Sequence, residues 1–305
     1  MGVNDWFYPQ YELTRAGWES VVDNAREGWQ YTGLRVASIV AGQELTLDEL
    51  PVERIIVPLS GAFEVSYTGS EINGAQRLVG RANVFEGPTD VLYLSSGLGA
   101  MITGEGRFAV AEAPTDEVFP VAYIPRESVA IEMRGAGSTS RQVHNFGSPA
   151  SLDASRIIVC EVITPAGNWS SYPPHKHDEY VAGKESQLEE IYYFETARER
   201  GTTQSSLTDP IGYMRNYSSL AGDIDTLAEV RTGDIALVPY GWHGPCVAAP
   251  GYDMYYLNVM AGPGPERTWL ICDDPAHAWV RSTWPTQKID PRLPYEAAPI
   301  KDQGK

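Results

Sequence analysis

The sequence has few cysteines and histidines and no long apolar run. Its three cysteines, Cys160, Cys246 and Cys272, are widely spaced without a C-x-x-C pair, so neither a disulfide framework nor a zinc ribbon is predicted. No apolar segment approaches the length that spans a membrane. The first residues contain an early acid and no apolar signal core. We therefore expect an unexported, cytoplasmic protein without a membrane anchor.

Basic residues are also scarce. The chain of 305 residues has 23 Lys and Arg against 40 Asp and Glu, which gives a formal net charge of -17. Such a charge repels nucleic acid and anionic membranes at long range, so we expect no partner of either class. An anionic small substrate would need local positive charge or a metal ion that overrides this overall field.

Long helical periodicity is scarce too, and short runs rich in β-branched and aromatic residues take its place. Gly and Pro turn signals separate these runs, a pattern typical of an all-β sandwich or barrel. The expected strands are 35–40, 54–57, 62–67, 91–94, 156–162, 191–194, 213–217, 235–238 and 254–259.

A faint internal repeat suggests that the fold is duplicated. The run 80–90 aligns with the run 233–243, which shares its glycine and apolar strand, so that Asp90 stands where His243 stands. Similarly, residues 53–57 align with 190–194, and Glu53 takes the place of Glu190.

No histidine precedes His144, so we expect the first half to have lost any metal site and to be structural. His144 and His277 lie outside the candidate site and are expected to be structural as well. The Gly, Ser and Pro residues of 145–155 indicate a linker. The expected parts are a first domain at 1–147, a second at 148–270 and an extended, proline-rich tail at 271–305.

Three of the five histidines belong to one candidate metal site. His175 and His177 share a face only if the backbone is extended, because side chains alternate across a strand. With Glu190 and His243 they form a mixed nitrogen and oxygen set suited to Zn, Mn, Fe, Co or Ni, and not to Ca or Mg. The lack of a thiolate favours a catalytic site with open positions. The alternative is a surface histidine pair beside a solvated glutamate.

These residues match the two cupin motifs, a histidine pair with a glutamate and then a run from a glycine to a histidine at 233–243. The gap between His177 and Glu190 is longer than usual, so residues 178–187 should loop out. More narrowly, the chain resembles the 5-deoxy-glucuronate isomerase family of myo-inositol catabolism, most densely from Ile157 to Trp269. The segments that carry this resemblance are 164–178, 188–193 and 255–263.

The resemblance implies an all-β bicupin, two jelly-roll barrels of which the first is degenerate. It implies the conversion of 5-deoxy-D-glucuronate, a small sugar acid, to 2-deoxy-5-keto-D-gluconate by a metal-dependent aldose–ketose isomerase. The expected ligands are His175, His177, Glu190 and His243, with zinc as the first choice and Mn, Fe, Co or Ni as alternatives. A divalent metal suits this chemistry because it stabilises the negative charge of an enediolate as a Lewis acid.

Two further side chains are candidates for direct contact with the substrate. Strand alternation from Glu190 places Tyr192 on the metal-facing side, where it could orient or protonate the substrate or simply pack the barrel wall. A substrate carboxylate favours an arginine fork. Arg215 in a predicted strand is the first candidate, with an outward salt bridge as its alternative role, and Arg267 is the second.

Other activities remain open at this stage. A 5-keto-4-deoxyuronate isomerase of pectin breakdown would share the ligands, an Fe(II) cupin dioxygenase would use a similar set, and a non-enzymatic sugar-binding cupin would bind without turnover. Trp269, Trp279 and Trp284 indicate that the C-terminal region packs against its own barrel or a neighbouring subunit, which leaves a homo-oligomer open.

Overall fold

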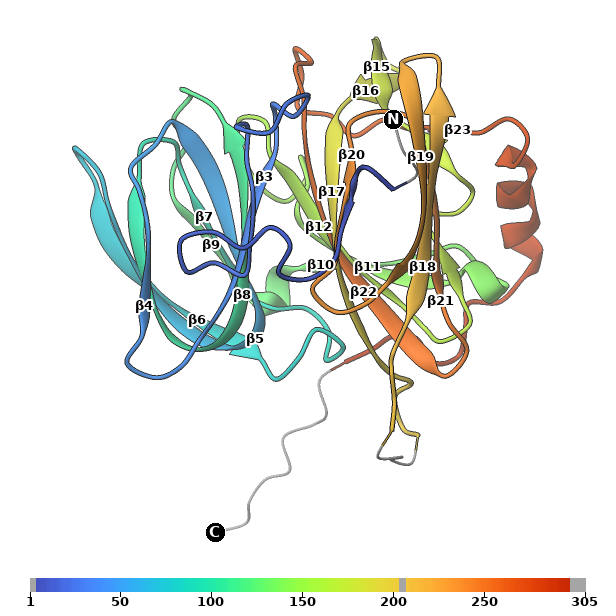
Figure 1. Cartoon of the computed structure of the whole chain (residues 1–305), viewed down its shortest axis with the longest axis horizontal. Helices are drawn as coiled ribbons and strands as arrows, with labels where there is room; N and C mark the ends of the chain where they lie inside the picture. Colours follow the sequence, from blue (N-terminus) through green and yellow to red (C-terminus); the bar gives the residue numbers. More distant parts are fainter. Residues whose placement is uncertain (1–3, 203–206, 297–305) are drawn as a thin grey trace.

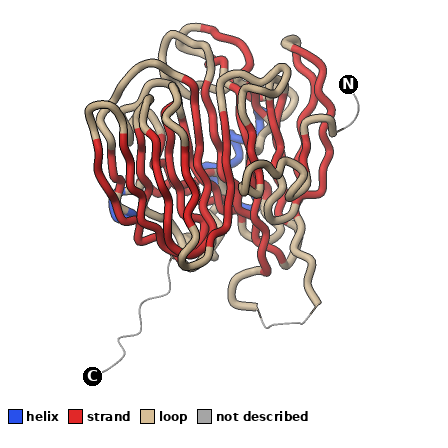
Figure 2. Tube along the Cα trace, turned by 60° about the vertical axis from the view of Figure 1, so that its left-hand side comes forward, coloured by secondary structure: helices blue, strands red, loops and turns tan. Residues whose placement is uncertain are grey.

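The computed structural model describes residues 4–202 and 207–296, and antiparallel β-strands make up most of them (Figure 2). The all-β expectation is confirmed. Within the described ranges the helical elements are three 3-10 turns, and no helix there is long and apolar enough to cross a membrane. These elements are η1 (Arg126–Ser128), η2 (Gly137–Thr139) and η3 (Ala278–Thr286).

The first half of the chain forms one strongly curved sheet of eight strands, seen in blue, cyan and green in Figure 1. Its order is β2-β3-β8-β5-β7-β9, with β4 added to β8 and β6 added to β5. The strands are β2 (Ser20–Val22), β3 (Gly33–Ile39), β4 (Glu44–Leu47), β5 (Val52–Thr68), β6 (Asn73–Arg81), β7 (Val91–Leu94), β8 (Gly99–Pro114) and β9 (Ala122–Ile124). Apolar side chains fill its interior, where Phe108 packs edge-on against Trp18 and Phe63.

The second half contains two larger sheets and a hairpin. One sheet has the order β1-β20-β17-β22-β12-β11-β10 and the other β19-β18-β21-β14-β23, with β13 paired to β21. The insertion at 178–187 is itself the hairpin β15–β16. The strands are β1 (Phe7–Tyr8), β10 (Ala130–Arg134), β11 (Arg141–Gly147), β12 (Ile158–Thr164), β13 (Trp169–Ser170), β14 (His175–Lys176), β15 (Asp178–Val181), β16 (Glu185–Gln187), β17 (Glu189–Arg198), β18 (Gly212–Ser219), β19 (Gly222–Val230), β20 (Ile235–Val238), β21 (Trp242–Ala248), β22 (Tyr252–Ala261) and β23 (Cys272–Asp273).

Sheet pairing crosses the expected domain boundary at residue 147. Strands β10 and β11 precede that residue, yet β11 pairs with β12 and both belong to a sheet of the second half. Strand β1, near the N-terminus, pairs with β20 in the same sheet. The segment 145–155, expected to be a linker, therefore begins inside β11. The second half is therefore built from two separate stretches of the chain, β1 and the run from β10 onwards.

The two halves repeat one strand order. The series β2-β3-β8-β5-β7-β9 corresponds to β11-β12-β22-β17-β20-β1, each read from its own sheet. The centre of each series has the same pairing. In the first half β5 pairs with β7 on one side and β8 on the other, and in the second half β17 pairs with β20 on one side and β22 on the other. The internal repeat expected from the sequence therefore corresponds to a repeat in topology.

Side-chain alternation corrects the alignment of that repeat. Ile56 packs inside the first sheet and Tyr192 inside the second half, so Arg54, and not Glu53, faces inward at the level of Glu190. By the same register Asp90 precedes β7 as Asp234 precedes β20, so Asp90 corresponds to Asp234 and not to His243. The sequence alignment was misled because both motifs contain glycine followed by an apolar run.

Arg54 occupies the first half's equivalent of the Glu190 position. Its guanidinium lies 2.8 Å from Oε1 of Glu112 and donates to the carbonyl oxygens of Leu98 and Asp48. The Glu112 carboxylate is held from its other side by Arg35 at 2.9 Å. A buried ion pair, with a hydrogen bond from each guanidinium nitrogen of Arg54, thus fills this position.

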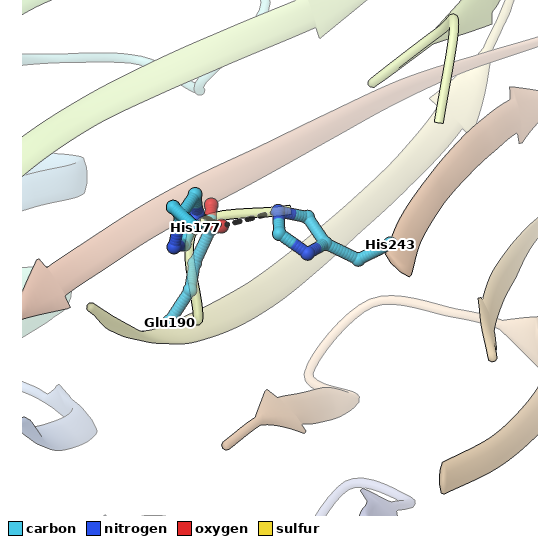
Figure 3. A group of neighbouring side chains, drawn as sticks. All are labelled: His177, Glu190 and His243. Carbon is cyan, nitrogen blue, oxygen red and sulfur yellow. Dashed lines mark hydrogen bonds and ion pairs between the residues drawn. The ribbon is translucent and has the colours of Figure 1, made fainter. Parts of the chain in front are cut away.

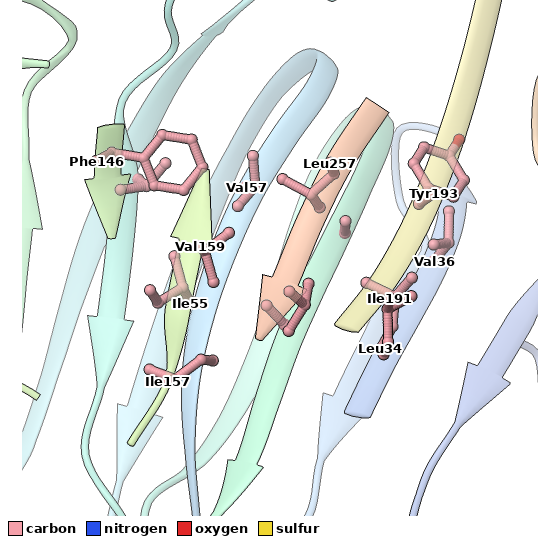
Figure 4. Packing of buried hydrophobic residues seen from close by; sticks show 14 of the residues in the cluster. Leu34, Val36, Ile55, Val57, Phe146, Ile157, Val159, Ile191, Tyr193 and Leu257 are labelled. Carbon is pink, nitrogen blue, oxygen red and sulfur yellow. The ribbon is translucent and has the colours of Figure 1, made fainter. Parts of the chain in front are cut away.

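The two halves pack face to face through a common apolar core (Figure 4). Leu34, Val36, Ile55 and Val57 come from the first half. Ile157, Val159, Ile191 and Leu257 come from the second half. Because all of these side chains are fully buried, the hydrophobic effect favours the two halves remaining together.

The region after residue 270, expected to be an extended tail, packs against the second half. Within the described part, β23 pairs with β14, and η3 lies at the right of Figure 1. The guanidinium of Arg134 lies over Trp269, and those of Arg141 and Arg281 lie over Trp284. Trp269 and Trp284 therefore pack against arginines of the chain's own sheet, whereas Trp279 is exposed.

Candidate metal centre

Three different strands or strand ends bring the histidine and glutamate side chains together. His175 lies on β14 directly opposite His243 on β21, and His177 follows β14 by one residue. Glu190 lies on β17 in the facing sheet, opposite Val238 of β20. The site therefore lies between the two sheets of the second half.

His177, Glu190 and His243 form the compact part of this group (Figure 3). One possible ligand atom from each lies within 4.8 Å of the others, and all three residues are buried. Oε2 of Glu190 lies 2.9 Å from Nε2 of His177 and 3.1 Å from Nε2 of His243. Three of the four predicted ligands are thus arranged so that they could hold a divalent metal ion.

Backbone carbonyl groups orient the three histidine rings. Each Nδ1 lies against a carbonyl oxygen to which it can donate, so a metal bound at Nε2 would leave these contacts intact. These contacts are His175 to Pro173 at 3.3 Å, His177 to Leu188 at 3.1 Å and His243 to Gly241 at 3.1 Å. Nε2 of His243 is buried, lies 3.1 Å from Oε2 of Glu190 and forms no well-aligned hydrogen bond. This atom and the nitrogen and oxygen donor set fit a divalent cation such as zinc.

The charges of the group are strongly coupled: against the cost of burial, the hydrogen bond and charge of Glu190 raise the pKa of His177. Burial alone would raise the pKa of Glu190, but the close contacts and charges of His177 and His243 hold it well below its ordinary value. Burial lowers the pKa of His175 well below its ordinary value, and the neighbouring His243 and His177 lower it further. Glu190 is therefore anionic and His175 neutral near pH 7.

His175 and Tyr192 lie beside the compact group. The ring centroid of His175 is 4.5 Å from that of His243 and 6.3 Å from that of His177. Tyr192 is buried, with its ring centroid 6.3 Å from that of His243 and its hydroxyl 3.0 Å from Oγ of Ser171. Burial raises the pKa of the Tyr192 hydroxyl well above its ordinary value, and the charge of Glu190 adds to this.

The turn that leads to His243 is fixed by Asp178. Its Oδ2 accepts the backbone N–H of Gly241 at 2.9 Å, while its Oδ1 accepts Nζ of Lys176 at 2.6 Å. Gly241 has φ +97°, and a Cβ there would lie 2.6 Å from Ile224, so this turn needs glycine. Asp178 thereby connects the strand that carries His175 with the turn before His243.

A cavity of about 400 Å³ opens beside the His/Glu group. His175, Glu190 and Tyr192 line it. Its wall also contains three arginines, Arg134, Arg141 and Arg281, together with Ser171, Tyr256, Asn258, Trp269 and Asp273. The cavity thus combines candidate metal ligands with a cluster of cations in a protein of strong negative charge.

Neither arginine predicted to bind the substrate lines this cavity. Arg215 lies on the outer face of β18, where it pairs with Asp225. Arg267 donates to the carbonyl oxygens of Ile157 at 2.7 Å, Leu152 at 2.5 Å and Gly147 at 2.7 Å, so its guanidinium is used in chain packing.

The arginines that do line the cavity escaped the sequence analysis. Arg134 and Arg141 lie on β10 and β11, which the sequence analysis assigned to the first half, and Arg281 lies in η3 within the expected tail. The available signal was the alternating pattern that starts at Arg141 and leads to His144. That pattern predicts a strand, but it does not reveal which sheet the strand joins.

The fold and the site define a class of protein: a duplicated antiparallel β protein with a His/Glu group inside its second half. Solved structures agree on the fold. The oxalate decarboxylase of Lactobacillus farciminis, in a formate complex, superposes with a TM-score of 0.61 at 10% identity, covering 90% of this chain and 89% of that chain. At this level of identity the likeness is one of fold alone.

The chain belongs to the KduI/IolB family, whose model matches residues 7–280. It is 39% identical over 257 residues to the 5-deoxy-glucuronate isomerase of Geobacillus thermodenitrificans, covering 83% of this chain and 87% of that protein. It is 36% identical over 253 residues to the 5-deoxy-glucuronate isomerase of Bacillus subtilis strain 168, covering 82% and 88%. A crystal structure of an IolB-like protein from Salmonella typhimurium LT2 superposes with a TM-score of 0.77 at 32% identity, covering 91% of this chain and 99% of that chain. The family resemblance seen in the sequence is confirmed.

Proposed function

We propose that this protein is an aldose–ketose isomerase that converts 5-deoxy-D-glucuronate to 2-deoxy-5-keto-D-gluconate in inositol catabolism. The observation that carries the proposal is one cavity lined by His175 and Glu190 of the His/Glu group and by three arginines. A sugar acid needs both features, a site for its carbonyl end and positive charge for its carboxylate. Family membership supports the substrate, because several curated relatives are named 5-deoxy-glucuronate isomerase.

The proposed architecture is a bicupin. The repeated strand order and the fold shared with oxalate decarboxylase support two barrels. The first barrel is degenerate, since Arg54 stands at the level of Glu190 and no histidine precedes His144. The second barrel takes in β1, β10 and β11 in addition to strands from residues 148–270.

The proposed metal ligands are His175, His177, Glu190 and His243, with zinc as the first choice. The bound cation would act as a Lewis acid on the substrate's carbonyl and hydroxyl oxygens and stabilise the charge that develops there. The chain supplies the dry surroundings, because the ligand side chains are almost entirely buried. Glu190 supplies the anionic donor that a buried dication needs.

Tyr192 is proposed to hold a proton near the reacting carbons. Its raised pKa keeps the hydroxyl protonated at neutral pH, so it can donate a hydrogen bond to a substrate oxygen. Ser171 connects it to Tyr256, with hydroxyl separations of 3.0 Å and 3.4 Å. This chain of hydroxyl groups leads along the cavity wall and can reposition a proton.

The test follows 5-deoxy-D-glucuronate by NMR in D2O, with metal-loaded protein, with protein stripped by a chelator and with the variant His175→Ala. We expect ketose to form with the loaded protein, and deuterium to enter beside the new carbonyl because the proton exchanges during transfer. Stripped protein should be inactive until zinc is returned. His175→Ala should bind less metal, measured by elemental analysis, and turn over more slowly.

Three results would contradict parts of the proposal. Full metal content in His175→Ala would remove His175 from the ligand set. Undiminished turnover after stripping would remove the metal from the mechanism. No turnover with Zn, Mn, Fe or Co would reject the substrate, and the pectin-derived 5-keto-4-deoxyuronate and an oxygen-consumption assay would then test the remaining activities.

A further inference from the structure

Arg141 is a buried cation without an acidic partner among the described residues. It is 5% exposed, and the hydrogen bond described for its guanidinium runs from Nη1 to the carbonyl oxygen of Thr139 at 3.0 Å. The other two arginines of the cavity are neutralised. Arg134 lies 2.7 Å from Glu132, and Arg281 forms two contacts with Asp273.

A buried and uncompensated charge is costly, so its retention calls for a function. Burial lowers the pKa of Arg141 to about 10, and nearby Arg134 and Arg281 contribute to this, yet the group stays protonated near pH 7. Trp284 lies 5.5 Å from the guanidinium carbon and packs against it. The side chain is thus held in place while its charge lacks an anion.

Arg141 lines the same cavity as His175 and Glu190. The cavity therefore offers candidate metal ligands and, separately, a planar cation with spare N–H groups. A carboxylate matches a guanidinium in geometry, because two parallel N–H groups can bind its two oxygens.

We propose that Arg141 binds the carboxylate of the sugar acid, so that the aldehyde end of the substrate lies at the His/Glu group. This inference rests on the proposed function and adds the direction in which the substrate lies. It replaces Arg215 and Arg267 as the carboxylate ligand. This binding mode also keeps the two ends of the substrate apart. The carboxylate neutralises Arg141, and the reacting carbons lie at the proposed metal ligands.

A binding experiment tests the anion site without turnover. D-Gluconate, an open-chain sugar acid, is titrated calorimetrically into chelator-stripped protein, into Arg141→Met and into Arg77→Met. We expect the Kd to rise at least tenfold in Arg141→Met, because the charge is lost while the side-chain length is kept. Arg77 is a matched control, with a side chain 71% exposed in the first half, and its variant should bind as the wild type does.

A kinetic experiment tests the direction of binding with 5-deoxy-D-glucuronate and 5-deoxy-D-glucose, in which an alcohol replaces the carboxylate. For Arg141→Met we expect kcat/KM on the acid to fall about a hundredfold, mainly through KM, and to change less than threefold on the neutral sugar. Arg141→Lys should recover part of the loss, because it restores the charge without the fork.

Equal losses on both sugars, or unchanged gluconate binding, would overturn the assignment. Circular dichroism and metal content of Arg141→Met serve as checks on folding. Failure of the proposed function is distinguishable: the wild type would then not turn over the acid, while gluconate binding would still depend on Arg141.

Discussion

At the scale of single residues, the buried carboxylate of Glu161 connects the two halves. Its oxygens accept two hydrogen bonds from Arg81 of the first half, both 2.7 Å, one from Tyr255 at 2.7 Å and one from Nδ1 of His144 at 2.6 Å. His144, expected to be structural, thus lies in this network. The sequence could not reveal the pairing, because Arg81 and Glu161 are 80 positions apart and no local pattern links them.

We expect Glu161→Gln to destabilise the fold by roughly 3 kcal/mol, because it leaves the Arg81 charge buried without its counter-ion. Burial alone would raise the pKa of Glu161. The charge of Arg81 and the hydrogen bonds of the network outweigh this effect and lower the pKa from 4.5 to about 2. The folded pKa lies below the unfolded value, so this stabilisation is complete above about pH 4.5 and disappears as the pH falls towards 2. Urea unfolding at pH 7 and pH 3 measures the difference.

The control for this prediction is Glu64→Gln, a change at a glutamate whose side chain is 57% exposed in a long ion pair of 3.8 Å. Its unfolding free energy should stay within about 0.5 kcal/mol of the wild type. A difference between wild type and Glu161→Gln that stays constant from pH 7 to pH 3 would contradict the assigned role of the carboxylate.

At the scale of secondary-structure elements, local patterns predicted strands but not their partners. Alternation correctly put Tyr192 on the face of Glu190, because that pattern depends only on the pleat of one strand. The pairing of β11 with β12 and β1 with β20 depends on which apolar faces meet after the chain folds. Arg141 was missed for two reasons. Its strand was assigned to the wrong half, and its cavity is completed by the C-terminal region, which supplies Asp273 and Arg281 to the wall.

The link between β14 and the turn before His243 gives a prediction at this scale. Asp178→Ala removes the acceptor shared by Lys176, Ser219 and the Gly241 N–H. We expect the Kd for zinc to rise about tenfold or more, because the turn then no longer fixes the His243 ring. Competition with a chromophoric chelator measures this affinity.

The matched control is Asp225→Ala, at an aspartate on β19 whose side chain is 55% exposed and paired with Arg215. Its zinc affinity should equal that of the wild type. Asp178→Asn keeps one acceptor oxygen, so its zinc affinity should lie between those of Asp178→Ala and Asp225→Ala. An unchanged affinity in Asp178→Ala would show that the turn holds its shape without this contact.

At the scale of the whole molecule, an acidic protein is proposed to bind an acidic substrate. The net charge of -17 repels an anion over long distances, whereas the arginines of the cavity act only close to it. Salt weakens these two effects unequally. Exposed charges are screened beyond about 30 Å at 0.01 M and beyond about 8 Å at 0.15 M ionic strength, while a buried contact such as that proposed at Arg141 is screened much less.

We therefore expect kcat/KM for 5-deoxy-D-glucuronate to rise about two- to threefold between 10 and 150 mM NaCl, because screening removes the repulsion and largely spares the buried contact. The neutral 5-deoxy-D-glucose should show no such rise, which separates electrostatics from a general effect of salt on the protein. Steady-state rates at constant pH and constant metal content provide the measurement. If kcat/KM for the acid instead falls with salt, the arginines of the cavity govern the approach of the substrate, and the charge of the remaining surface has little influence on it.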